Sequence, residues 1–452
     1  MVGSRLHLKL LRDIRFSPAM FAGVVFLLLV GIALYGASYE LYLNLQNSYT
    51  LSYRRLRLAD FTVPVQSAPT DIIATLRSIP GVGAVEGRII QEVEIEQPTA
   101  QTRKVIGRVI SLPDAGNPQV NQVKLIAGAM PGRSPRQELL LEASFARYHN
   151  YRPGDTLRIV ILDDEVRFRV AGIVQSAEYI YVVRGSEYPM PTPSTFGVMW
   201  MRKAEADALF DSGGAVNEVS FTMAPGGNRQ AAARLAEQLL EPYGATEVIT
   251  QEEQPSVELL RIDLQGLQTM AVFFPLLFLI ISSLGVYNML SRMVVAQRGQ
   301  IGFLRAVGLS RYAVALHYLE FSLIIGVLGG VLGSLLGHLL GILVTRYYTQ
   351  FIEVPYYDVT PRWGVIIAGF LLAVGVTPIS GLIPARGAAG LTPAEALRAE
   401  APTRGRVPPF ERYVQFLQRW TLMARLPLRY FVRNPRRTMA TVAGVASAAT
   451  LL

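Results

Sequence analysis

Four long apolar runs divide the chain into parts that suit a membrane and parts that suit water. Each run is at least as long as the roughly 20 residues that a helix needs to cross a bilayer. The runs are Ala19–Tyr39, Leu264–Leu290, Val314–Val344 and Trp363–Ile383. The pattern therefore predicts four transmembrane helices.

The two ends of this pattern require interpretation. Tyr35–Ser38 is loosely similar to a signal-peptide cleavage site, but the first run is long for a signal peptide, which favours a spanning helix. A further apolar run starts at Met439 and reaches the last residue. Because a spanning helix cannot stop inside lipid with unpaired carbonyl groups, we interpret the chain as the N-terminal portion of a longer protein.

Residues 41–262, between the first two runs, alternate strand and helix signals and so predict a folded α+β domain. Thr70–Glu96 has the pattern of a capped helix, a Pro-Gly turn and a strand. Tyr151–Leu162 and Glu165–Val174 have the pattern of a hairpin. From Gln251 onward, a polar helical pattern enters the second apolar run without a stop, which predicts a continuous stalk that transmits motion.

Composition and charge agree with a membrane protein. The chain is 51% hydrophobic and 17% charged, which is too apolar for an ordinary soluble protein of this length. Three segments are strongly basic: together they hold 19 Lys and Arg against 4 Asp and Glu, and they are residues 1–17, 292–311 and 386–437. By contrast, residues 41–262 hold 22 Lys and Arg against 25 Asp and Glu. By the positive-inside rule, the three basic segments are cytoplasmic and residues 41–262 lie outside. This distribution argues against nucleic-acid binding, despite the net charge of +9.

Few residues offer catalytic or metal chemistry. The chain has no cysteine and four histidines, which excludes thiol catalysis and cysteine-ligated zinc. His317, Glu320 and His338 lie in the third apolar run, where ionisable groups raise a functional hypothesis. The first two are near the start of that run and His338 is 18 residues beyond Glu320, so a shared proton or metal site is not favoured. We predict no catalytic residue, metal or cofactor.

The segment between the second and third runs combines glycines, positive charge and helical spacing. In a helix, Arg298, Gly302 and Arg305 fall on one face. An interior glycine costs a helix about 1 kcal/mol relative to alanine, so these glycines predict that another backbone approaches closely. The alternative is an interfacial helix whose arginines follow the positive-inside rule and whose glycines pack against neighbouring helices.

The third run contains glycines at four-residue intervals, with two more beside them. Such spacing lets another helix approach closely in lipid. The surface has two interpretations, pairing with the other half of a pseudo-symmetric membrane protein or ordinary packing within one bundle. The helix-packing glycines are Gly326, Gly329, Gly330, Gly333, Gly337 and Gly341.

Several motifs, in order along the chain, resemble the FtsX-like ABC permease family, which includes the MacB and LolC/LolE proteins. "AQRGQIGFLRAVGLSR" at Ala296–Arg311 resembles the family's cytoplasmic loop, and Pro384–Glu400 resembles its proline-and-ALR segment. "GRSPRQELLLEASFARYHNYRPGDTLRI" followed by "FRVAGIV" resembles the MacB-type periplasmic domain. Leu426–Ala446 echoes Leu6–Phe26, which is similar to the start of a second tandem unit.

The resemblance implies an α-helical polytopic membrane protein with an inserted α+β extracytoplasmic domain of the MacB-like periplasmic core type. It implies a multi-pass protein of the inner (cytoplasmic) membrane with a cytoplasmic N-terminus. The implied parts are 1–40 (N-terminus and first transmembrane helix), 41–262 (outside domain with stalk), 263–385 (FtsX-like unit), 386–437 (cytoplasmic linker) and 438–452 (start of a second unit).

The implied function is that of a non-catalytic permease subunit of a type VII ABC transporter. Its partners would be a cytoplasmic ABC ATPase, the lipid bilayer and a second permease unit in the same longer chain or a second copy. The chain has no G-x-x-x-x-G-K-[ST] phosphate loop, which agrees with an ATPase in a separate protein. The substrate would be a lipid, lipoprotein or small amphiphile. One alternative is a mechanotransmitting regulator of an envelope enzyme, and a weaker one is a membrane-anchored sensor without an ATPase.

The resemblance also implies two groups of functional residues. The ATPase-coupling residues would be Gln297, Arg298, Gln300, Ile301, Gly302, Leu304, Arg305 and Gly308. The cytoplasmic motif would be Pro384, Arg386, Pro393, Ala396, Leu397 and Arg398. The family commonly has acidic residues where this chain has Gln297 and Gln300, and neutral amides cannot form the charged pair.

Overall fold

The structure is a computed structural model that describes residues 9–10, 12–16, 18–96, 105–132, 137–161, 164–185 and 193–397. The chain forms two compact units. Of the described residues, the helical unit comprises those up to Glu40, Gln268–Ile342 and those from Pro361 onward. The α+β unit comprises the described residues of Leu41–Leu267 and Leu343–Thr360. The predicted second unit and most of the predicted linker lie outside the described residues.

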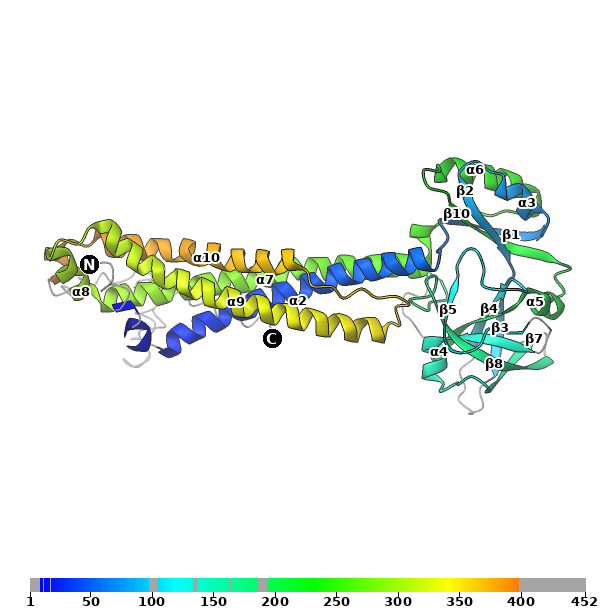
Figure 1. Ribbon diagram of the computed structural model, residues 1–452, viewed down its shortest axis with the longest axis horizontal. Coiled ribbons are helices and arrows are strands. Elements are labelled where there is room, and N and C mark those ends of the chain that lie inside the picture. The colour runs from blue at the N-terminus through cyan, green and yellow to red at the C-terminus, as the bar shows by residue number, and fades with distance from the viewer. Residues whose placement is uncertain are drawn as a thin grey trace, which may run out of the picture. The chain divides into compact units, whose positions relative to one another are not determined.

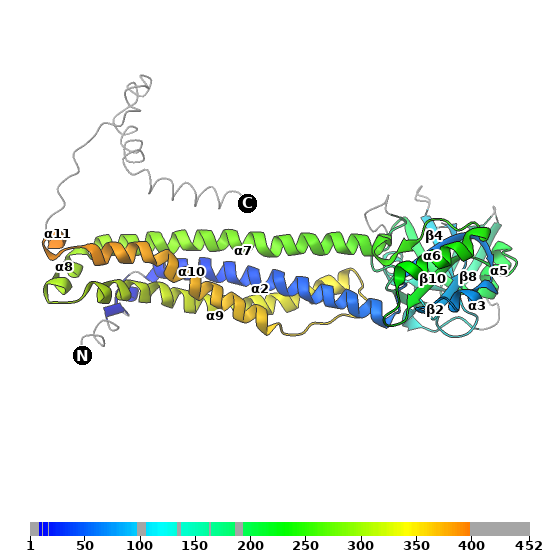
Figure 2. The same cartoon turned by 90° about the horizontal axis from the view of Figure 1, so that it is seen from above.

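Four long helices lie side by side in the helical unit (Figures 1 and 2). They are α2 (Pro18–Arg55), α7 (Pro255–Ala296), α9 (Arg311–Phe351) and α10 (Trp363–Gly390). Within the described residues, these four are the helices that are long and apolar enough to cross a membrane. Each predicted apolar run lies inside one of them, so the prediction of four transmembrane helices is confirmed.

The helices continue beyond the apolar runs. The 42-residue α7 starts in the polar sequence at Pro255, and α10 ends at Gly390 instead of Ile383, with Pro378 and Pro384 inside it. Hydropathy detects the part of a helix that suits lipid, whereas the helix itself ends where capping or a turn interrupts it. Two short helices complete the unit: α8 (Arg298–Ala306) between α7 and α9, and α11 (Pro393–Leu397) after α10.

The α+β unit contains two sheets, one antiparallel with four strands and one mixed with seven strands. The four-stranded sheet has the order β11-β1-β10-β2 and the seven-stranded sheet the order β5-β8-β6-β9-β4-β3-β7. The pairs β4–β9 and β6–β8 are parallel, and the other pairs are antiparallel. The strands are β1 (Phe61–Pro69), β2 (Val82–Arg88), β3 (Ile90–Glu96), β4 (Val105–Leu112), β5 (Val123–Gly128), β6 (Glu138–Glu142), β7 (Thr156–Ile161), β8 (Asp164–Ser176), β9 (Phe196–Arg202), β10 (Ala215–Met223) and β11 (Ile249–Thr250).

Short helices cover the sheets. The helices α3 (Ile72–Arg77) and α6 (Arg229–Leu240) bury their apolar sides against the four-stranded sheet, where the rings of Phe61 and Phe221 stack at 4.5 Å. The helices α4 (Ala143–Tyr148) and α5 (Lys203–Phe210) contribute Phe145 and Ala206 to the core of the seven-stranded sheet. The inserted α+β domain that the sequence predicts is therefore confirmed as a fold.

The local predictions in this unit hold with two differences. The helix, Pro-Gly turn and strand expected in Thr70–Glu96 are α3, a turn at Gly81 with φ of 85°, and β2, and the expected hairpin is β7 with β8. However, the N-cap of α3, Asp71, makes no side-chain capping bond. The strand-like sequence before Gln251 forms a strand of only two residues, Ile249 and Thr250. This strand, β11, pairs with β1 at the edge of the four-stranded sheet.

Candidate functional site

The helix α8 is a short, sharply ended element between two membrane helices. It stops at Gly308, which has φ of 98°, a left-handed conformation that glycine adopts without a Cβ penalty. The N–H of Leu309 donates to the carbonyl oxygen of Leu304, and the N–H of Gly308 to that of Arg305, both at 3.1 Å. These are the paired bonds of a Schellman motif. Gly308 thus ends α8, and a Cβ placed there would meet nothing within 4 Å.

One face of α8 turns into the protein. Ile301 and Gly302 are buried, and Arg298 and Arg305 are half-buried on the same side. Arg298 Nη2 donates to the carbonyl oxygen of Glu395 in α11 at 2.8 Å. The shared face of Arg298, Gly302 and Arg305 therefore exists, but in this structure it faces the chain itself, because burying Ile301 brings its helical neighbours inward.

The opposite face of α8 is exposed and uncharged. It carries Gly299, Gln300, Phe303 and Val307, and the side chains of Phe303 and Val307 are 65% and 67% exposed. A Cβ at Gly299 would meet no atom within 4 Å. The predicted coupling residues do not include Phe303 and Val307. Their i, i+4 spacing in the sequence indicates that they form an apolar strip on one side of a helix.

Gln297 lies on the inner side of this corner. Its Oε1 accepts hydrogen bonds from Lys9 Nζ at 3.1 Å and from the Tyr318 hydroxyl at 2.9 Å. Lys9 also forms an ion pair with Asp13 at 2.5 Å. The neutral amide at position 297 therefore joins the N-terminal segment to the start of α9, and Gln300 is the predicted amide that remains on the exposed face.

The helix α11 packs beside α8 at the same end of the helical bundle (Figure 2). It begins with a capping box, because the Thr392 N–H donates to Glu395 Oε2 at 3.2 Å and the Glu395 N–H donates to Thr392 Oγ1 at 3.3 Å. Of the predicted cytoplasmic motif, Pro384 is buried in α10, and Arg386 is exposed.

The rest of that motif belongs to α11. Pro393 starts this helix, where the missing N–H of proline costs nothing, and Ala396 is buried. Leu397 is its last residue. Arg398 lies outside the described residues. The structure thus brings the described parts of the two predicted motifs together in one corner, formed by α8, α10 and α11.

The glycine rows of α9 contact two neighbouring helices of the same bundle. A Cβ at Gly337 would lie 2.8 Å from the carbonyl oxygen of Ala33 in α2, and one at Gly330 would lie 3.0 Å from Ala373 in α10. Gly329, Gly333 and Gly341 likewise meet α2, and Gly326 meets α10. Packing within one bundle is therefore the arrangement of these glycines in this structure.

The two histidines of α9 lie in different surroundings. His338 Nδ1 lies 3.0 Å from both carboxylate oxygens of Glu40, a buried residue of α2. His317 is buried, with its ring 5.5 Å from that of Tyr318 and 5.4 Å from that of Phe321. Among the residues that the structure describes, no three His, Cys, Asp or Glu side chains are placed to hold a metal ion.

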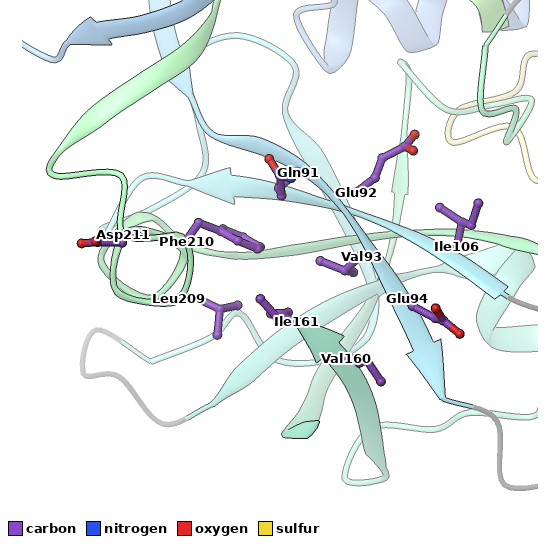
Figure 3. A pocket seen from close by; sticks show the side chains of 10 residues that line it. All are labelled: Gln91, Glu92, Val93, Glu94, Ile106, Val160, Ile161, Leu209, Phe210 and Asp211. Carbon is purple, nitrogen blue, oxygen red and sulfur yellow. The ribbon is translucent and has the colours of Figure 1, made fainter. Parts of the chain in front are cut away.

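The α+β unit has an open groove of about 600 Å³ at the C-terminal end of α5. Figure 3 shows Val93, Ile161, Leu209 and Phe210 gathered at its apolar part, while the carboxylate of Glu92 extends away from them. The lining combines apolar side chains with the acidic side chains of Glu92, Glu94 and Asp211.

The four spans define the chain as a multi-pass membrane protein. Residues 272–393, which include α8, α9 and α10, match the model of the FtsX-like permease C-terminal domain. The chain therefore carries an FtsX-like permease domain, as the motif at Ala296–Arg311 predicted. No curated protein sequence matches the chain.

Two solved structures are similar to part of the chain. The extracellular domain of the noncanonic ABC-type transporter YknZ from Gram-positive bacteria is 10% identical, with a TM-score of 0.30, over 42% of this chain and 98% of that one. The periplasmic region of MacB from Actinobacillus actinomycetemcomitans is 12% identical, with a TM-score of 0.30, over 45% of this chain and 93% of that one.

Proposed function

We propose that the chain is the non-catalytic permease subunit of a type VII ABC transporter, and that a separate cytoplasmic ATPase docks on the exposed face of α8. The observation that carries the proposal is the exposure of Phe303 and Val307 on an uncharged helix face within the FtsX-like domain. An apolar surface of this kind at a rigid corner suits a protein partner. Arg298 and Arg305 then support α8 from behind.

The same proposal assigns a side to each part of the chain. The basic segments 1–17 and 292–311 lie in the cytoplasm by the positive-inside rule, and the α+β unit lies outside the cytoplasmic membrane. The 42-residue helix α7, which contains Pro275, continues from the α+β unit into the helical unit, so it connects the two units, as α2 and α9 also do. A second permease unit completes the transporter.

We further propose that the α+β unit handles an amphiphilic substrate such as a lipid or lipoprotein. The open groove with its apolar part around Leu209 and Phe210 supports substrate handling over the regulation of an envelope enzyme. Substrate extraction or export is then driven by motion of this unit, and ATP is hydrolysed in the partner.

The test is the purification of full-length protein in gentle detergent as wild type and as Phe303→Asp. We expect an ATPase with a phosphate loop to co-purify with the wild type. Because burying a phenylalanine at an interface contributes about 2 kcal/mol, we expect the variant to bind this ATPase roughly 30-fold more weakly. Mass spectrometry identifies the partner, and titration of the purified ATPase measures the affinity.

Tyr148→Asp is the matched control, because Tyr148 is a 57% exposed aromatic residue of the α+β unit, far along the sequence from α8. It should leave the affinity for the ATPase unchanged. Both substituted side chains are exposed, so both variants should unfold at the wild-type temperature. Equal ATPase affinity of Phe303→Asp and wild type would rule out α8 as the docking surface.

A further inference from the structure

A second cavity of the α+β unit, of about 320 Å³, lies where the two sheets meet the start of α7. Glu218 of β10 lines it from the four-stranded sheet, and Glu92 of β3 and Arg108 of β4 line it from the seven-stranded sheet. Glu178, after β8, and Gln254, just before α7, complete its polar wall. The cavity thus contacts elements that come from distant parts of the sequence.

A buried ionic cluster forms one side of this cavity. Arg88 is 5% exposed and donates from Nε to Glu218 Oε1 at 2.5 Å and from Nη1 to Glu178 Oε2 at 2.7 Å. Its Nη2 donates to the other oxygen of Glu178. Glu178 and Glu218 line the cavity, whereas Arg88 does not.

Glu92 is held at the other side of the cavity. Arg108 Nη2 donates to Glu92 Oε1 at 2.9 Å, and Arg184 Nη2 donates to Glu92 Oε2 at 2.7 Å. Burial alone would raise the pKa of Glu92, but these hydrogen bonds outweigh it and lower the pKa, so this carboxylate is ionised. The wall therefore holds three carboxylates, and each of them accepts hydrogen bonds from arginine: Glu178 and Glu218 from Arg88, and Glu92 from Arg108 and Arg184.

Gln254 gives the independent sign of a ligand. Its side chain lines the cavity and is 6% exposed, and its Oε1 has no hydrogen-bond partner among the described residues. A buried carbonyl without a partner costs free energy, so a bound group that donates a hydrogen bond to it is favoured. Burial also raises the pKa of Glu218, although Arg88 opposes this, and a second cation beside Glu218 would favour its ionised form.

We propose that this cavity binds a small amphiphilic cation, with a primary ammonium group at Glu218 and Gln254 and an apolar body against Ile90, Val183 and Ile249. The cavity volume is at the small end of ligand sites, which suits a compact molecule and not a lipid. An ammonium has three N–H donors, which match the carboxylate and amide acceptors of the wall. The described residues offer no group of three acidic or histidine ligands for a metal ion instead. The site is independent of the docking surface on α8.

The test measures the binding of hexylammonium, hexanol and hexanoate to the full chain in detergent by titration calorimetry. These probes share one alkyl chain and differ in the charge of the head group. We expect saturable binding of hexylammonium, with hexanol weaker by roughly tenfold or more and hexanoate without binding, because a charge-assisted hydrogen bond is lost or reversed.

Two substitutions at Gln254 make opposite predictions. Gln254→Glu places a carboxylate where the unpartnered carbonyl lies and should tighten hexylammonium binding, whereas Gln254→Leu should weaken it. Glu218→Gln should also weaken hexylammonium binding by roughly tenfold. If Glu218→Gln unfolds because Arg88 loses a partner, the two Gln254 variants provide the test instead. The exposed Glu237→Gln in α6 is the control and should bind as the wild type does. The proposal is overturned if hexylammonium does not bind, if hexanol binds equally well, or if both Gln254 variants bind like the wild type.

Discussion

The contact between α2 and α9 makes a quantitative prediction for Gly337→Ala. In the wild type, backbone atoms of Ala33 and Gly36 lie directly across from Gly337. A Cβ added at Gly337 would lie 2.8 Å from the Ala33 carbonyl oxygen and 3.1 Å from the Cα atoms of Ala33 and Gly36. Carbon atoms normally approach to about 3.5–4.0 Å, so α2 would have to move away by roughly half an ångström or more. Overpacking of this kind costs about 1–3 kcal/mol.

The matched control is Gly375→Ala in α10, where an added Cβ would meet nothing within 4 Å. Both substitutions gain the same helix propensity, up to about 1 kcal/mol, so the difference between the two variants isolates the packing cost. We expect Gly337→Ala to be less stable than Gly375→Ala by about 1–3 kcal/mol. Reversible unfolding of the full chain in mixed micelles measures the difference. Equal free energies of unfolding would refute the close backbone contact.

Two other predictions concern α7 and the buried carboxyl of Glu142. Gly266→Pro adds a second proline to α7, which already contains Pro275, and should weaken this helix at a cost of about 3 kcal/mol. It should reduce any ATP-dependent change in the protease sensitivity of the α+β unit, while the ATPase still co-purifies. Gly266→Ala should preserve that change, since an added Cβ there meets nothing within 4 Å, and an unaltered response in Gly266→Pro would show that α7 does not carry the motion. Burial raises the pKa of Glu142 to about 7, against the opposing hydrogen bonds from Ser144 and Phe145. Between the unfolded value of 4.5 and about 7, the folded protein holds a proton that the unfolded chain releases, so Glu142 makes stability fall as pH rises through this window. Glu142→Gln should therefore lose less stability than the wild type between pH 5 and 7.5 in thermal unfolding, and identical pH profiles would contradict the shift.

The membrane helices were predictable because their signal is local. Twenty apolar residues in a row need no partner to be recognised, and all four runs lie inside observed helices. The helix ends were less predictable. The polar start of α7 at Pro255 follows a separate 3-10 helix, Gln251–Glu253, which has its own capping box, in which the Thr250 N–H donates to Glu253 Oε2 at 2.8 Å.

At α8, spacing predicted which residues share a face but not which face turns inward. Arg298, Gly302 and Arg305 do lie together, yet Ile301 beside them is 1% exposed and brings that side into the bundle. Phe303 and Val307 form an equally apolar strip and remain exposed. The choice between two such strips depends on the surrounding helices, which a single sequence window does not contain.

The cavity at Gln254 could not be predicted from sequence. Glu178 and Glu218 are separated from Arg88 by 90 and 130 residues. Sheet pairing places Glu218 of β10 opposite Arg88 of β2. Isolated Arg and Glu residues in a nearly neutral domain resemble any solvated surface. Their burial becomes visible after the topology is known.

The left-handed turn at Gly308 makes the end of α8 independent of the side chains on its outer face. The turn that ends α8 depends on the left-handed backbone conformation of Gly308. The chemical character of the outer face of α8 depends on side chains such as Gln300 and Phe303. Substitutions on the outer face can therefore change which partner is accepted without altering the angle at which it is presented.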